Sequence, residues 1–215
     1  MDLPDLLEPA RIRCRCDIQS KKRALQTLAE ILAEALRAHA NGDGRGGPDA
    51  GSGASGGAPK GEADGGREGG SRIGGRMLGR RDKEARSGKR GQTAGAEAAE
   101  VSDMDILDAL ISRERLGSTG LGHGVALPHS RLDVVDAPLA AMITLKEGVD
   151  FESADGEPVD LVLGLLVPRD CNDEHLKILA NLARRFNDAA LREALRDQAS
   201  GEELFAYLQR LDGAK

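Results

Sequence analysis

The sequence has few of the features that mark secreted, disulfide-rich or membrane proteins. Its three cysteines, Cys14, Cys16 and Cys171, are too few and too unevenly placed for a disulfide framework. It has no uninterrupted apolar run of about 18 residues, the length of a membrane span, and no apolar segment with signal-peptide flanks. We therefore expect a cytoplasmic, reduced protein without membrane insertion.

Large apolar side chains are scarce in one long internal segment, residues 41–100. This segment contains 19 of the 28 glycines, and so little apolar surface cannot offset the entropy cost of ordering the chain. We expect a disordered Gly-rich insertion at 41–100 that separates a first part, 1–40, from a remainder, 101–215. Together these two parts would form one domain of about 155 residues. Because loop-closure entropy grows slowly with length, the insertion should leave catalysis intact.

The later part of the predicted insertion is basic. Eight Lys or Arg residues and only two acidic residues lie between Arg72 and Arg90, although the whole chain has a formal net charge of -6. A basic arm can bind nucleic acid or an acidic protein surface. This one contains no aromatic residue. We therefore interpret it as a solvated segment and do not expect a nucleic-acid partner.

The most informative stretch is 120–129, which reads Gly-Leu-Gly-His-Gly-Val-Ala-Leu-Pro-His. Its glycines permit tight turns, and residues 125–127 can form a strand. Pro128 fixes its own φ and favours an extended Leu127, so His129 should leave the end of the strand in a defined direction. This pattern predicts that the imidazole of His129 is held in a position where it can take part in a reaction.

A second histidine stands in a comparable position. His175 follows the apolar run 161–167 and Pro168, close to the expected start of a helix at Asp173. The amide groups and dipole of a helix start would favour an incoming phosphate and disfavour a protonated imidazole. A neutral imidazole is also a competent nucleophile near pH 7, because its ordinary pKa is about 6.5. The two histidines are therefore the candidate site.

The remaining patterns predict a mixed α/β domain. Strands are expected at 11–16, 125–127, 138–146 and 160–167, and helices at 22–37, at 102–114, from 173 onward, around Leu191 and Leu195, and after Ser200. The near-continuous apolar run at 160–167 is typical of a central strand covered on both faces. In the helix from 173, residues recurring at helical spacing are expected in the core: Leu176, Leu179, Leu182 and Phe186.

Several linked motifs, in this order, resemble one known family. The motifs are at 110–120, 124–129, 158–161 and 173–176. In these motifs the chain is similar to the IIA proteins of the bacterial phosphotransferase system, of the fructose and mannitol type, and most of all to their nitrogen-regulatory branch. The segment 3–37 also resembles the family's opening strand and helix. The resemblance implies a three-layer α/β/α sandwich with a mixed sheet. The insertion at 41–100 is a departure from the family, whose members usually have a short connection there.

The resemblance also implies roles for individual residues. His129 would be the phosphoryl acceptor, carrying a tele-phosphohistidine after transfer from a histidine-phosphorylated, HPr-like carrier of the nitrogen branch. His175 would stabilise the phosphoryl group, and Arg113 would hold phosphate oxygens. Charge spreads over the equatorial oxygens in phosphoryl transfer, so hydrogen-bond donors are useful there, and the hydroxyls of Ser118 and Thr119 could add two.

The implied protein is a component of a phosphotransfer relay and not a stand-alone enzyme, and it needs no cofactor. Its regulatory targets would be proteins such as sensor kinases or potassium transporters, so that it controls nitrogen metabolism and potassium homeostasis. An alternative is a non-catalytic binding module of the same fold, in which the basic insertion is the recognition arm and His129 is structural.

A metal site was the third possibility. It would combine His123, His129, His175 and Cys171, but no pair of these has the i,i+4 spacing that places two ligands on one helical face. We therefore expect no metal and no metal-dependent hydrolase.

Overall fold

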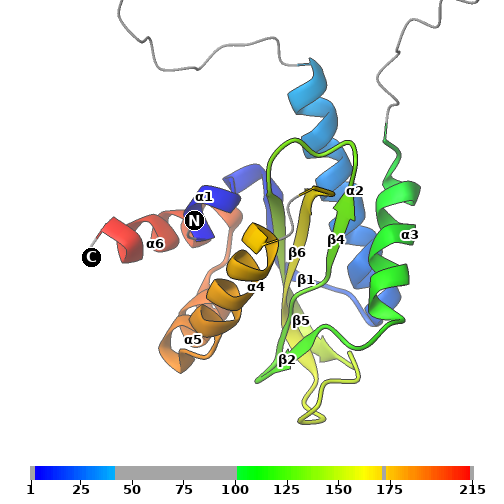
Figure 1. Cartoon of the computed structure of the whole chain (residues 1–215). Helices are drawn as coiled ribbons and strands as arrows, with labels where there is room; N and C mark the ends of the chain where they lie inside the picture. Colours follow the sequence, from blue (N-terminus) through cyan, green and yellow to red (C-terminus); the bar gives the residue numbers. More distant parts are fainter. Residues whose placement is uncertain (1–2, 42–100, 171–172, 214–215) are drawn as a thin grey trace, which may run out of the picture. The chain divides into compact units, whose positions relative to one another are not determined.

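The computed structural model describes residues 3–41, 101–170 and 173–213 (Figure 1). Except for residue 41, the predicted insertion at 41–100 lies outside the described residues, and so does Cys171. All three described ranges belong to one compact unit. No helix in the described ranges combines the length and the hydropathy of a membrane span.

The elements follow one another in an α/β order. They are α1 (Leu3–Leu6), a short 3-10 turn (Pro9–Arg11), β1 (Ile12–Cys16), α2 (Lys21–Asn41), α3 (Asp103–Glu114), β2 (Gly120–Gly122), β3 (Val125–Ala126), β4 (His129–Leu132), β5 (Leu139–Val149), β6 (Val159–Pro168), α4 (Asp173–Phe186), α5 (Ala189–Asp197) and α6 (Gly201–Gly213). The predicted capping box of α3 is present, with Ser102 and Asp105 bonded reciprocally.

The strands form one six-stranded mixed sheet in the order β1-β5-β6-β3-β2, with β4 also paired to β6. β6 is antiparallel to β5 and parallel to β3 and β4. Its residues are almost all buried, which confirms the predicted central strand. β3 and β4 lie end to end along the same side of β6, because Ala126 pairs with Val162 and His129 pairs with Leu165.

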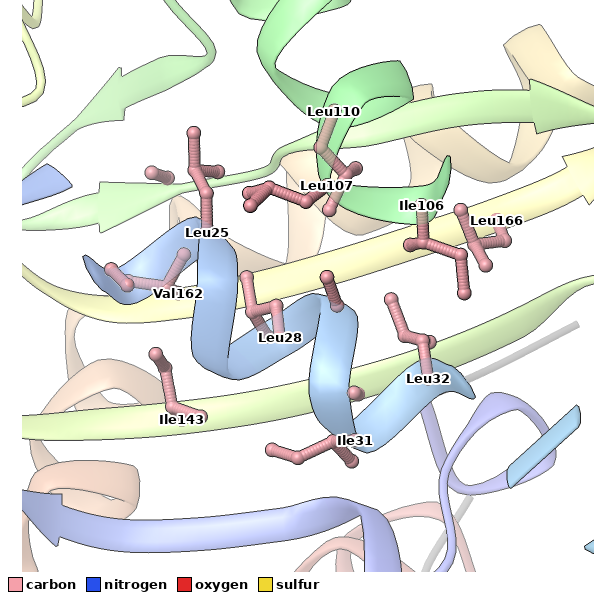
Figure 2. Packing of buried hydrophobic residues seen from close by; sticks show 14 of the residues in the cluster. Leu25, Leu28, Ile31, Leu32, Ile106, Leu107, Leu110, Ile143, Val162 and Leu166 are labelled. Atoms are coloured by element: carbon pink, nitrogen blue, oxygen red, sulfur yellow. The ribbon is translucent and has the colours of Figure 1, made fainter. Parts of the chain in front are cut away.

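Helices cover both faces of this sheet, which confirms the expected three-layer α/β/α arrangement (Figure 1). On one face, α2 and α3 pack against β5 and β6 through the aliphatic side chains labelled in Figure 2. Gly164 of β6 lets α2 approach closely, because a Cβ atom there would lie 3.2 Å from two carbons of Leu28. On the other face, α1, α4, α5 and α6 bury a second apolar cluster.

The helices α2 and α3 run in opposite directions. Lys21, the first residue of α2, reaches Glu114, the last residue of α3, with 2.7 Å between Nζ and Oε1. The end of α2 and the start of α3 therefore both lie towards the other end of this helix pair, where the longer α2 extends beyond α3 (Figure 1).

One predicted core position was wrong, and two strands were not predicted. Leu176 is 62% exposed. The buried stripe of α4 begins instead at His175 and continues through Ile178, Leu182 and Phe186. The strands β2 and β4 were missed, so His129 is the first residue of a strand and not a residue beyond a strand end.

Candidate functional site

The backbone around His129 fixes both the position of its ring and its protonated nitrogen. Between β3 and β4, the carbonyl of Pro128 accepts a hydrogen bond from Leu165 N–H at 2.9 Å, which anchors the start of β4 on β6. The carbonyl of Leu127 lies 2.8 Å from His129 Nδ1. A carbonyl can only accept, so Nδ1 carries the proton and Nε2 of the neutral ring has the free lone pair.

The guanidinium of Arg113 donates a hydrogen bond to that lone pair. Arg113 lies in the last turn of α3, and its Nε–H donates to His129 Nε2 at 3.0 Å. Its Nη1 also donates to the carbonyl of Gly117 at 3.1 Å, which holds the side chain over the loop after the helix. The contacts on the two sides of the His129 ring thus agree on one tautomer.

The second imidazole comes from the opposite layer. His175 lies in the first turn of α4, as predicted, and is 4% exposed. Its ring centroid is 5.4 Å from that of His129, and the ring planes make an angle of 79°, an edge-on arrangement. Its Nδ1 accepts a hydrogen bond from Arg131 Nε–H at 3.3 Å. The structure therefore brings together the three residues predicted as the core of the site: Arg113, His129 and His175.

Sequence reasoning missed Arg131. It lies on β4 two positions after His129, and alternate residues of a strand share a face. This alternation was the available signal, but it required β4 to be recognised as a strand.

Burial and neighbouring cations keep both rings neutral at pH 7. The pKa of His129 is lowered mainly by burial and further by Arg113 and Arg131, while the Leu127 carbonyl and Glu114 act in the opposite direction. The pKa of His175 is lowered to about 4, first by burial and then by His129, Arg131 and Arg113. A neutral imidazole at His129 is the form that can act as a nucleophile.

The hydroxyls of Ser118 and Thr119 are engaged within the loop after α3. Ser118 Oγ donates to the carbonyl of Phe151 at 2.6 Å and accepts from Gly120 N–H at 3.0 Å. Thr119 is buried, and its Oγ1 donates to Glu114 Oε2 at 2.5 Å. In this structure both residues shape the loop beside the site.

The glycine-rich segment forms a tight hairpin between β2 and β3. Its two turn residues, His123 and Gly124, both have positive φ, 56° and 77°, as in the primed turns of two-residue hairpins. A side chain at Gly124 would collide with Arg196, which donates to Asp160 through Nε at 2.8 Å and Nη2 at 2.9 Å and to the His123 carbonyl at 2.9 Å. His123 is thus an exposed turn residue, remote from the roles of His129 and His175.

The described residues contain one group with the spacing of metal ligands, and it excludes the two site histidines. It consists of His123, Asp155 and Glu157, all exposed. Asp155 has a structural function there, because its Oδ2 accepts the His123 N–H at 2.7 Å. At the candidate site itself, two guanidinium groups donate to two neutral imidazoles, and such N–H donors suit the oxygens of a phosphoryl group.

Known proteins resemble this chain in both sequence and fold. Residues 93–211 match the family described as "Phosphoenolpyruvate-dependent sugar phosphotransferase system, EIIA 2". A nitrogen regulatory protein of Pseudomonas aeruginosa is 41% identical over 117 residues, which are 53% of this chain and 76% of the relative. The crystal structure of the nitrogen regulatory protein IIA-Ntr from Neisseria meningitidis is similar with a TM-score of 0.63 and 27% identity, over 96% of this chain and 98% of that one. IIA mannitol from Escherichia coli shares the fold, with a TM-score of 0.54 and 18% identity, over 94% of this chain and 98% of that one.

Proposed function

This chain belongs to the EIIA 2 family of the phosphoenolpyruvate-dependent sugar phosphotransferase system, among its IIA-type nitrogen regulatory proteins, and from that premise we propose that His129 accepts a phosphoryl group from a histidine-phosphorylated, HPr-like carrier protein. One observation supports this most strongly. Nδ1 of His129 is bound to a carbonyl, so its Nε2 lone pair faces Arg113. That lone pair belongs to a neutral, partly buried imidazole.

The proposed transfer is a balanced exchange between two imidazoles. The lone pair of His129 Nε2 forms a new bond to phosphorus while the bond between phosphorus and the carrier's histidine breaks, returning its electron pair to that nitrogen. Positive charge develops on the His129 ring, and the Leu127 carbonyl, which accepts from Nδ1–H, stabilises it. The product is a tele-phosphohistidine.

The neighbouring residues act on the phosphoryl oxygens in this proposal. Arg113 would release Nε2 of His129 and donate its N–H groups to the incoming group, where charge is greatest. His175, edge-on to His129, would donate from its Nε2. Ser118 and Thr119 would support the site by holding the loop, since their hydroxyls are already engaged.

We also propose that the phosphorylation state is read by protein partners. The named relatives are nitrogen regulatory proteins, which supports a role in nitrogen metabolism. Sensor kinases and potassium transporters are the proposed classes of target, and potassium homeostasis is the second proposed output. A partner protein would distinguish the phosphorylated from the unphosphorylated form by the phosphoryl group on His129, which adds about two negative charges.

The test is intact-mass analysis after incubation with phosphoenolpyruvate, the first phosphotransferase enzyme and the histidine carrier. The wild-type protein should gain one acid-labile phosphoryl group, and His129→Ala should gain none. The matched control is His123→Asn, because this exposed turn histidine has a left-handed backbone that Asn tolerates. It should be phosphorylated like the wild type. Folded wild-type protein that gains no mass from an active carrier would contradict the proposal and favour the non-catalytic binding module.

A further inference from the structure

We propose that Arg131 is a positioning residue: it holds His175 in the tautomer whose Nε2–H donates to the phosphoryl group on His129. This role rests on the proposed function and adds to it a residue that the motifs did not indicate. It concerns the second histidine, whose usefulness to an anionic group depends on which of its two nitrogens carries the proton.

The geometry around His175 specifies that proton. Arg131 Nε–H is a donor at all accessible pH values, and it lies 3.3 Å from His175 Nδ1. Nδ1 must therefore accept, and a neutral ring then carries its proton on Nε2. His129 is held in the opposite tautomer, because its Nδ1 donates to the Leu127 carbonyl. One ring thus offers a lone pair at Nε2, and the other offers a proton at Nε2.

Arg131 is held in place by the sheet. In the parallel pairing of β4 with β6, His129 lies opposite Leu165 and Arg131 lies opposite Val167. This register places the nucleophile and the guanidinium two residues apart on one strand, where both contact His175. A rigid strand therefore couples the orientation of the second histidine to the position of the first.

The charge of Arg131 supports the same role. His175 is buried and faces His129 and Arg131 from β4 and Arg113 from α3, and burial together with these three groups lowers its pKa. Protonation of both His175 nitrogens is therefore disfavoured, and the hydrogen bond to Nδ1 is preserved. Without Arg131, both neutral tautomers become accessible to His175, while burial still disfavours the imidazolium.

The first measurement reads tautomers directly in the unphosphorylated protein. Side-chain nitrogen NMR should show proton occupancy at Nε2 of His175 and at Nδ1 of His129 in the wild type. In Arg131→Met, the His175 signals should shift towards a mixture of tautomers while those of His129 stay unchanged. Arg131→Gln retains an N–H donor and should restore much of the His175 pattern. Arg13→Met is the matched control, since Arg13 is an exposed arginine on β1, with the same change in net charge.

The second measurement is the transfer rate from the phosphorylated carrier. Arg131→Met should lower it by about 10-fold, the lower end of what partners that orient ligand histidines contribute in metal sites. In a His175→Ala background the same change should have little further effect, because a residue that acts through His175 loses its role with it. A full additional loss in that background would show that Arg131 contacts phosphate directly and would overturn the positioning role.

The outcomes separate this inference from the proposed function. A wild-type protein that accepts no phosphoryl group contradicts both. A wild-type protein that is phosphorylated on His129, combined with an unchanged His175 tautomer in Arg131→Met, overturns the inference alone.

Discussion

Two polar clusters lie at the end of α3 and differ in the kind of group to which their cations are bonded. The structural cluster consists of Lys21, Glu114 and Thr119. Its carboxylate accepts from Lys21 Nζ at 2.7 Å, from Thr119 Oγ1 at 2.5 Å and from Thr119 N–H at 3.2 Å. The reactive cluster consists of Arg113, His129, Arg131 and His175. There, cationic groups are bonded to neutral rings.

The contrast begins with two adjacent residues of one helix. Glu114 points into the buried structural cluster, where its bonds to Lys21 and Thr119 offset part of the cost of burying its charge and fix the loop. Arg113 points to His129 and is bonded there to a neutral acceptor, so its charge is available to an incoming anion. The comparison teaches that a cation bonded to a carboxylate stabilises the fold here, whereas the reactive cluster bonds Arg113 and Arg131 to neutral imidazoles.

The largest expected effect comes from breaking the structural cluster with Glu114→Ala. This change removes the acceptor of Thr119 N–H and one of the two carboxylates that bind Lys21 Nζ. The free energy of unfolding should therefore fall by about 4 kcal/mol. Chemical denaturation measures it. Glu152→Ala is the matched control: Glu152 binds the same Lys21 at 2.9 Å, but its side chain is 79% exposed. It should cost below about 1 kcal/mol. Equal losses in the two variants would contradict the division into two clusters.

Acid should destabilise the protein through the reactive cluster. The folded-state pKa of His175 is about 4, below the ordinary value of 6.5, so between these values the unfolded state binds more protons. The free energy of unfolding should therefore fall as the pH decreases from 6.5 to 4, by at most about 3 kcal/mol from this residue. Denaturation of wild type and His175→Gln across this range measures the contribution. A pH dependence that is the same in both would show that His175 is not held neutral.

Removing one cation from the reactive cluster should affect transfer and not stability. Arg113→Met should lower the rate of phosphoryl transfer to His129 by about 100-fold, the size seen when one donor to developing charge is lost. Its unfolding free energy should change by less than about 1 kcal/mol, because the side chain is only half-buried. Arg115→Met, with an exposed side chain on the same helix end, is the control for charge and should transfer normally. A large stability loss in Arg113→Met would place Arg113 in the structural cluster instead.

Local signals in the sequence predicted the central strand, α3 and the two histidines, whereas the three layers and the role of Arg113 were implied by the family resemblance. An apolar run predicts β6, and a capping box predicts α3. β4 was not predictable in the same way. Its sequence, His-Ser-Arg-Leu, has no apolar run, and it forms a strand because it pairs in parallel with β6. Arg131 was missed for that reason, since its role depends on the strand.

The error at Leu176 has a related cause. Four residues at helical spacing predicted one apolar face of α4, but His175 and Ile178 occupy its first two buried positions, each one residue before the predicted leucine. A histidine is not counted as apolar in such patterns. The buried face of α4 therefore depends on a tertiary contact, the packing of the His175 imidazole against His129 and Arg131.

The antiparallel pairing of α2 and α3 determines where, in the described unit, the chain ends that flank residues 42–100 lie. The chain leaves the described unit after Asn41 and returns before Asp103, whereas Arg113 lies at the opposite end of α3. A helix of this length spans about 17 Å. The start of α3 is thus a natural attachment point: a fluorophore, an affinity tag or a fused domain joined just before Asp103 would be bonded about one length of α3 from Arg113.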